Sequence, residues 1–316
     1  MVSSFTSRFA DAVTQADNSE LTAPFPGGRR WLRLVVFLPL ATLTTLLTFV
    51  ILVVVGELVP ALGAQMNTLG ERIEDTPLRL IEEGYRTLAF GMTVGLVAFS
   101  LLATAAMTWR TPLKAFLWPG RPFDLKLFGL GLVTMIAISI LWIPFSLATG
   151  GEWRPPVFDT YYVEYTRYTY VIAMAVALFA GAAAEEVICR GVLLRVSALI
   201  TRRSLLLCLI NGLLFSAVHL DPDPVSFLQR ALVGMGWAWA ALRLGGLEFA
   251  IGAHFANNLF ITLIWSPMSA ASQTQEVPWF VVVPELITMA VVVVVVEVLA
   301  RRRRQRPPGS AEPQAA

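Results

Sequence analysis

The sequence predicts an all-α fold, a polytopic helical membrane protein with about eight transmembrane helices. Hydrophobic residues make up 56% of its 316 residues and charged residues only 15%, whereas a soluble domain carries about 25% charged residues. The mean hydropathy is +0.66. So few charges cannot cover a globular surface, and lipid must therefore be the solvent for much of the chain. In lipid the backbone must satisfy its own hydrogen bonds, which favours helices.

The same counts exclude other classes of protein. Two cysteines are too few for a secreted disulfide scaffold. A net charge of +2 is too small for a basic nucleic-acid binder, so we expect no nucleic-acid partner. The first 30 residues are polar and contain no long apolar run, so the sequence predicts no cleavable signal peptide there.

Apolar stretches with few charges recur along the chain, each close to the roughly 20 residues that a helix needs to cross the hydrocarbon core. The predicted spans are residues 34–56, 88–109, 127–148, 169–194, 204–220, 226–243, 247–266 and 279–299. They divide the chain into a polar N-terminal tail (1–30), three transmembrane helices with an acidic outer loop (31–168), a core (169–266), a last transmembrane helix (267–300) and a basic, then disordered, tail (301–316).

Basic residues predict the orientation of these spans. They gather at Arg29, Arg30, Arg33, Arg110, Lys114, Arg121, Lys126, Arg195, Arg202, Arg203 and Arg301 to Arg304. Eight spans place all of these on one side, which the positive-inside rule assigns to the cytoplasm together with both termini. The opposite loop, residues 57–87, holds six acidic and three basic residues. The chain has 22 arginines and two lysines, which indicates a GC-rich bacterial genome and hence a bacterial cell membrane.

The fourth span contains charged residues that lipid disfavours. Glu185, Glu186 and Arg190 each cost about 2.5 to 3.5 kcal/mol near the centre of a membrane helix. Glu186 and Arg190 are four residues apart and can pair on one helix face. Glu185 points elsewhere and needs another partner, a water-filled cavity or a proton. A structural salt bridge would explain Glu186 and Arg190 but would leave Glu185 unexplained.

The only two histidines also lie in predicted spans. His219 follows Phe215 by four residues, and His254 precedes Asn258 by four. Each alone is typical of a structural hydrogen bond between helices, worth about 1–2 kcal/mol. However, Glu185 and His219 are equally far in sequence from the turn at Arg202, so an antiparallel hairpin brings them to similar depth. Gly181 and Ala182 to Ala184 would let these helices approach closely. Convergence of all three helices is a hypothesis.

Such a group of side chains is suited to activating water. A partly desolvated Glu185 would serve as general base, and His219 would orient the water or carry its proton. His254 and Asn258 could donate hydrogen bonds to an oxyanion, while Glu186 and Arg190 would hold Glu185 in place. Glu185, His219 and His254 are also candidate zinc ligands, since three such ligands plus water suit catalytic zinc. Neither a Gly-x-Ser-x-Gly elbow nor a His-Glu-x-x-His motif is present.

These residues resemble the three signature motifs, in order, of the CPBP intramembrane proteases, also called the CAAX prenyl protease 2 or Abi-like family. The matching motifs are Glu185-Glu186-x-x-x-Arg190, Phe215-x-x-x-His219 and His254-x-x-x-Asn258. The resemblance implies a CPBP-like catalytic core and an intramembrane endopeptidase of glutamate or metalloprotease type. It implies that Glu185 and His219 activate water and that His254 and Asn258 form the oxyanion hole. The family label allows zinc or no cofactor.

The expected partners are the lipid bilayer and a membrane-associated peptide or protein substrate. A bacterial origin argues against prenylated CAAX substrates. Two other functions stay open. One is a non-catalytic immunity or scaffold membrane protein of the same family. The other is a proton-coupled transporter that uses the intramembrane ionisable groups as a relay, although the inverted repeats and paired broken helices common in transporters are not visible here.

Overall fold

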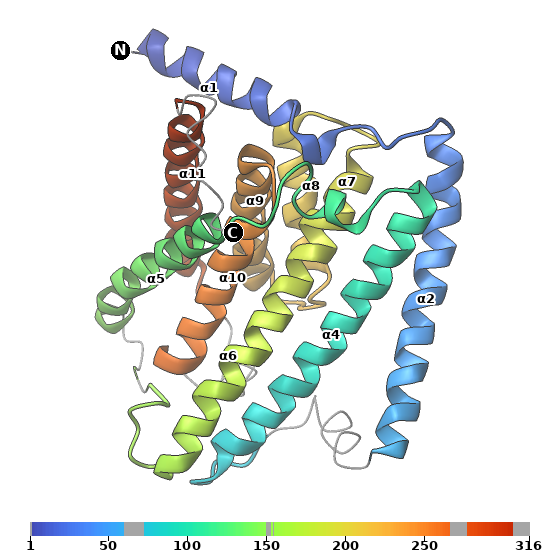
Figure 1. Cartoon of the computed structure of the whole chain (residues 1–316). Helices are drawn as coiled ribbons and strands as arrows, with labels where there is room; N and C mark the ends of the chain where they lie inside the picture. Colours follow the sequence, from blue (N-terminus) through green and yellow to red (C-terminus); the bar gives the residue numbers. More distant parts are fainter. Residues whose placement is uncertain (1, 60–72, 150–152, 154, 266–276, 306–316) are drawn as a thin grey trace, which may run out of the picture.

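The computed structural model describes residues 2–59, 73–149, 153, 155–265 and 277–305, and this part of the chain contains helices and no strand. Figure 1 shows the helices as a bundle. Its main helices are α1 (Val2–Asp17), α2 (Arg30–Leu58), α4 (Arg79–Trp109), α5 (Leu125–Ala148), α6 (Glu164–Glu186), α7 (Leu194–Ser197), α8 (Ser204–Ala217), α9 (Pro224–Leu244), α10 (Glu248–Phe260) and α11 (Val282–Arg304). The expected disordered tail after Gln305 and part of the acidic loop, residues 60–72, lie outside the described residues.

The predicted helical membrane fold is confirmed. Five helical stretches are long and apolar enough to cross a membrane: α2, α4, α5, the continuous stretch Glu164–Ser197, and Trp279–Arg304. α8 is a shorter apolar helix, and α9 and α10 occupy the other two predicted spans. The protein is therefore an integral membrane protein.

Two boundaries differ clearly from the prediction. α4 begins at Arg79, nine residues before the predicted span, because its first turns carry ion pairs rather than apolar side chains. Arg79 pairs with Glu83 at 3.7 Å and Arg86 with Glu82 at 2.5 Å, each four residues apart along the helix. The polar tail also begins with a helix, α1, which buries Ala12 and Ala16. It lies across the end of the bundle at which α2 begins and α11 ends (Figure 1).

Glycines set the closest helix contacts. A Cβ at Gly131 of α5 would collide with the carbonyl oxygen of Phe249 in α10, and a Cβ at Gly252 would collide with that of Phe128. α8 and α9 meet in the same way at Gly212 and Gly234. These backbone-to-backbone contacts bring α5 against α10 and α8 against α9, and α10 also packs against α6.

The expected role of Gly181 is wrong. A Cβ at Gly181 would meet no atom within 4 Å, so this glycine does not mediate a close approach. Gly212 and Gly234 supply the close contact one helix further on, because α8 packs mainly against α9 rather than against α6.

Candidate functional site: two glutamates and two histidines

Both glutamates lie where the fourth apolar stretch changes its helical form. Glu185 and Glu186 end α6, and the chain continues as a π-helical segment, η3 (Val187–Leu193). π-Helical turns are rare and occur frequently at functional sites. The carboxylates thus lie just before a local widening of the helix and Arg190 lies within it, inside the continuous stretch Glu164–Ser197.

Glu186 is fully buried, and both Arg190 and His254 contact its carboxylate. Arg190 Nη1 donates to Glu186 Oε1 at 2.8 Å, and both side chains have no exposed surface. Arg190 Nη2 donates to the carbonyl of Gly234 in α9 at 3.0 Å. His254 Nδ1 lies 2.9 Å from the same Oε1 of Glu186. The Glu186 carboxylate therefore links α6 to η3 and α10. The Arg190 guanidinium links the same group to α9.

Glu185 faces both histidines. Its Oε2 atom lies 3.8 Å from His219 Nε2 and 3.6 Å from His254 Nε2. The side chains of Glu185 and His219 keep 21% and 31% of their surface, whereas His254 keeps 4%. Oε2 itself is buried and has no hydrogen-bond partner among the described residues. The structure thus brings together the three helices whose convergence was a hypothesis.

The contacts of the Nδ1 atom in each imidazole indicate which ring nitrogen carries the proton and which one faces Glu185. His219 Nδ1 lies 2.8 Å from the carbonyl oxygen of Phe215, and His254 Nδ1 faces the Glu186 carboxylate. Carbonyl and carboxylate oxygens only accept, so Nδ1 carries the proton in both rings. In its neutral form each imidazole then turns the lone pair of Nε2 toward the Glu185 oxygen. Three acceptor atoms around one space call for a donor between them, such as a water molecule or a proton.

Aromatic rings surround the two imidazoles. The Trp237 indole stacks on His254 with ring centroids 4.4 Å apart, and Phe215 lies edge-on to both His219 and His254, at 5.1 and 5.7 Å. Arg190 lies over the Phe215 ring at 4.4 Å. This packing locks the rings in place and keeps the Glu186–Arg190 pair dry. Trp237 was missed in the sequence because a tryptophan in an apolar helix carries no motif.

A cavity of about 420 Å³ opens in front of Glu185. Its walls include His219, His254 and Asn258, and also Asn257 and Glu285, neither of which is a signature residue of the three motifs. Asn257 Nδ2 donates to Asn258 Oδ1 at 3.2 Å. This hydrogen bond uses the side-chain oxygen of Asn258 and does not use its N–H groups. The remaining lining residues are Phe90, Phe215, Ser226, Gln229, Arg230, Val233, Trp237, Ile261 and Thr262.

The cavity lies toward the end of the bundle opposite the arginine-rich end. Ser226 and Arg230 belong to the first two turns of α9, and Glu285 belongs to the first turn of α11. Both helices begin at whichever of their ends is farther from α1 (Figure 1). Next to the cavity, Asp221 accepts from Arg230 at 2.5 Å. This hydrogen bond and that from the Asp223 backbone N–H hold the pKa of Asp221 below its ordinary value.

The hypothesis of a metal site is not supported by a grouped set of ligands. Among the described residues no three His, Cys, Asp or Glu side chains are grouped as the ligands of one metal ion. Cys189 and Cys208 are both buried and unbonded.

The fold and the site together define a class: an integral membrane protein with paired glutamates and histidines around a cavity between its helices. Residues 167–260 match the family model described as Type II CAAX prenyl endopeptidase Rce1-like, which confirms the resemblance to the CPBP proteases. All seven candidate residues lie inside the matched segment. Because the matched family is a protease family, the match supports the assignment of a peptidase.

A curated relative carries no function in its name. The protein YyaK of Bacillus subtilis (strain 168), described as uncharacterized, is 23% identical over 163 residues. The match covers 49% of this chain and 52% of YyaK, so the chain spans about half the length of this relative.

Proposed function

We propose that the protein is an intramembrane endopeptidase that cleaves a membrane-associated peptide or protein with water activated by Glu185. The observation that carries this proposal is the convergence of Glu185 Oε2 with two histidine Nε2 atoms at 3.6 and 3.8 Å, beside an open cavity. Distances slightly beyond a direct hydrogen bond suit a water molecule bound between the groups.

The first step makes the nucleophile. Glu185 accepts a proton from the bound water while His219 Nε2 orients it, and the resulting hydroxide oxygen attacks the carbonyl carbon of the scissile peptide bond. The π bond of the carbonyl breaks as the new C–O bond forms, and its electron pair moves to the carbonyl oxygen. Glu186 and Arg190 do not contact the substrate; they position His254 and the helix that carries Glu185.

The second step collapses the tetrahedral intermediate. His254 takes up a proton from solvent at Nε2 before the reaction and keeps it throughout. Its Nε2–H group and the Asn258 amide donate hydrogen bonds to the oxyanion. The C–N bond then breaks, and the proton held by Glu185 passes to the leaving amine, directly or through His219. His254 is suited to this role because the Glu186 carboxylate, 2.9 Å from Nδ1, fixes the ring with Nε2 on the side of Glu185.

The cavity's position also bears on how a substrate enters. Its mouth lies away from the arginine-rich end, and the positive-inside rule assigns that end to the cytoplasm. We infer that both termini are cytoplasmic, that the membrane is a bacterial cell membrane and that the substrate enters from the outer side.

The test compares newly formed peptide termini in membranes of cells that express the wild-type protein or Glu185→Gln. We expect cleavage products in the wild type that are absent in Glu185→Gln and His219→Ala. Glu164→Gln is the matched control, because it makes the same change at the other end of α6 and should keep all products. Products that persist in both site variants would contradict the proposal.

The same variants separate the alternatives. A phenotype that survives Glu185→Gln without any cleavage product would favour the immunity or scaffold function. Proton-driven uptake of a solute into proteoliposomes, lost in the same variant, would favour the transporter.

A further inference from the structure

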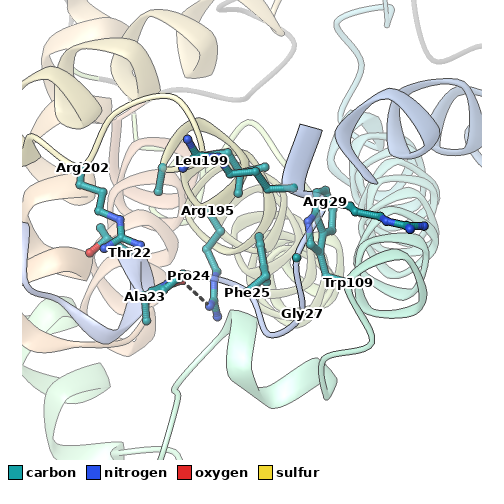
Figure 2. Close-up of a pocket in the computed structure, with 13 residues that line it drawn as sticks. Thr22, Ala23, Pro24, Phe25, Gly27, Arg29, Trp109, Arg195, Leu199 and Arg202 are labelled. Carbon is teal, nitrogen blue, oxygen red and sulfur yellow. Dashed lines mark hydrogen bonds between the residues drawn. The ribbon is translucent and has the colours of Figure 1, made fainter. Parts of the chain in front are cut away.

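A second cavity lies at the opposite, arginine-rich end of the bundle. It measures about 320 Å³, and Figure 2 shows many of the residues that line it. Four arginines line it, and no Asp or Glu does. They are Arg29 and Arg30 at the start of α2, Arg195 in α7, and Arg202 in the loop before α8. Segments far apart in the sequence thus contribute positive charge to one hollow.

One of these arginines is part of the protein interior. Arg195 is 5% exposed, and its guanidinium lies over the adjacent rings of Phe25 and Phe116, at 4.7 and 5.2 Å. It donates to the carbonyls of Ala115 and, at 3.4 Å, Ala23, while its Nε atom has no partner among the described residues. The dashed line in Figure 2 marks the contact to Ala23. Glu20 interacts electrostatically with Arg195, but it does not line the hollow. A buried cation with an unpaired N–H group favours a further anion on the hollow side.

The wall of this hollow offers further donors. Trp109 is fully buried, and its indole N–H also has no partner among the described residues. α2 begins here without any side-chain cap at Arg29, so the N–H groups of its first turn and its positive dipole end face the same region. Gly27 and Gly28 line the hollow just before α2, and a Cβ at Gly28 would meet no atom within 4 Å. Helix N-termini of this kind bind phosphate groups.

Apolar surface continues from the hollow along α2. Trp31, Leu32 and Val35 follow within its first two turns and are 51%, 55% and 65% exposed. Phe25, Trp109 and Leu199 line the hollow itself. A free phosphate would use only the arginines and the helix end, whereas a phospholipid would also cover this apolar face.

We propose that this hollow binds the phosphate head group of an anionic phospholipid, with the acyl chains along α2. The site is independent of the proposed peptidase function. Its position at the arginine-rich end places it at the leaflet where anionic lipids attract basic residues.

The test measures lipid retained by the full-length protein in detergent, by native mass spectrometry. Phosphatidylglycerol is compared with phosphatidylcholine of the same acyl chains and with inorganic phosphate. Arg30→Gln/Arg202→Gln removes two exposed arginines and leaves the buried Arg195 in place. We expect a preference for phosphatidylglycerol in the wild type and its loss by about 30-fold in this variant, from the usual contribution of two basic residues near a membrane surface.

Arg301→Gln/Arg302→Gln is the matched control, because it removes the same charge from the exposed end of α11 and touches no part of the hollow. The control should keep the preference. An equal loss in the control, or no loss in Arg30→Gln/Arg202→Gln, would overturn the proposal, as would inorganic phosphate that displaces the lipid at equal concentration.

Discussion

Glu185 Oε2 lies 3.6 Å from Nε2 of His254, while the next residue, Glu186, lies 2.9 Å from Nδ1 of the same ring. Two consecutive carboxylates therefore contact one imidazole from opposite sides. This is possible because successive helical residues point about 100° apart. Glu186 is fully buried and Glu185 is not, so one carboxylate fixes the ring and the other faces the cavity.

Asn258 should matter through its N–H donors. Asn258→Asp keeps the shape of the side chain but removes these donors and adds negative charge, so we expect turnover to fall by about 10² to 10³-fold with little change in KM. The measurement is the rate of cleavage of a substrate found by the comparison of membrane termini. Turnover equal to the wild type would exclude Asn258 from the oxyanion hole.

Arg190 should contribute strongly to the stability of the fold. Arg190→Leu leaves the Glu186 carboxylate without its guanidinium in a site that excludes solvent, and breaking a buried pair costs about 3–5 kcal/mol. We expect a clear fall in the thermal midpoint in detergent. The double variant Glu186→Gln/Arg190→Leu removes the unpaired charge and should regain part of the loss. A midpoint in Arg190→Leu equal to that of the wild type would show that the pair does not stabilise the fold.

Two glycines of α5 form a matched pair for helix packing. Gly131→Ala places a methyl group against the Phe249 carbonyl, whereas Gly129→Ala meets no atom within 4 Å. Overpacking costs about 1–3 kcal/mol, so Gly131→Ala should lower the thermal midpoint and Gly129→Ala should leave it unchanged or raise it. Equal effects of the two substitutions would contradict the close approach of α5 and α10.

The inferred orientation can be checked by thiol labelling. Leu220 is 88% exposed beside the cavity end, Ile200 is 69% exposed at the arginine-rich end, and the native cysteines are buried. A membrane-impermeant maleimide should label Leu220→Cys in intact cells. It should label Ile200→Cys only after the membrane is permeabilised. The reverse pattern would mean that the cavity opens to the cytoplasm.

The Asp221–Arg230 pair should stabilise the loop beside the cavity until Asp221 is protonated at acidic pH. Arg230 lowers the pKa of Asp221 from 3.8, so the stabilising contribution is complete above that value and is lost only as the pH falls through the lower folded-state pKa. Nuclear magnetic resonance of the Asp221 carboxyl should show titration below 3.8 in the wild type and a shift back toward 3.8 in Arg230→Gln. Titration of Asp221 above 3.8 in the wild type would contradict this sign.

Much of the site was accessible from the sequence because charge is conspicuous in lipid. Glu185, Glu186 and Arg190 interrupt an apolar helix, and the only two histidines lie in two others. Hairpin spacing placed Glu185 near His219, and the structure has them 3.8 Å apart. Trp237 and Asn257 also contact or line the site, yet uncharged helix residues give no comparable signal. Glu285 did carry it, as a charge within the predicted span 279–299, but it belongs to no motif.

The sequence by itself determined the solvent, the helical fold and the residues too polar to lie in a membrane without a reason. Composition and periodicity are local properties, and a membrane allows few backbone structures. Only the tertiary structure decided which carboxylate is sealed and which faces the cavity. It also decided that the small residues in contact are Gly212 and Gly234, and that arginines from separate segments share a second hollow. These depend on which helix faces meet, and that follows from packing over the whole bundle.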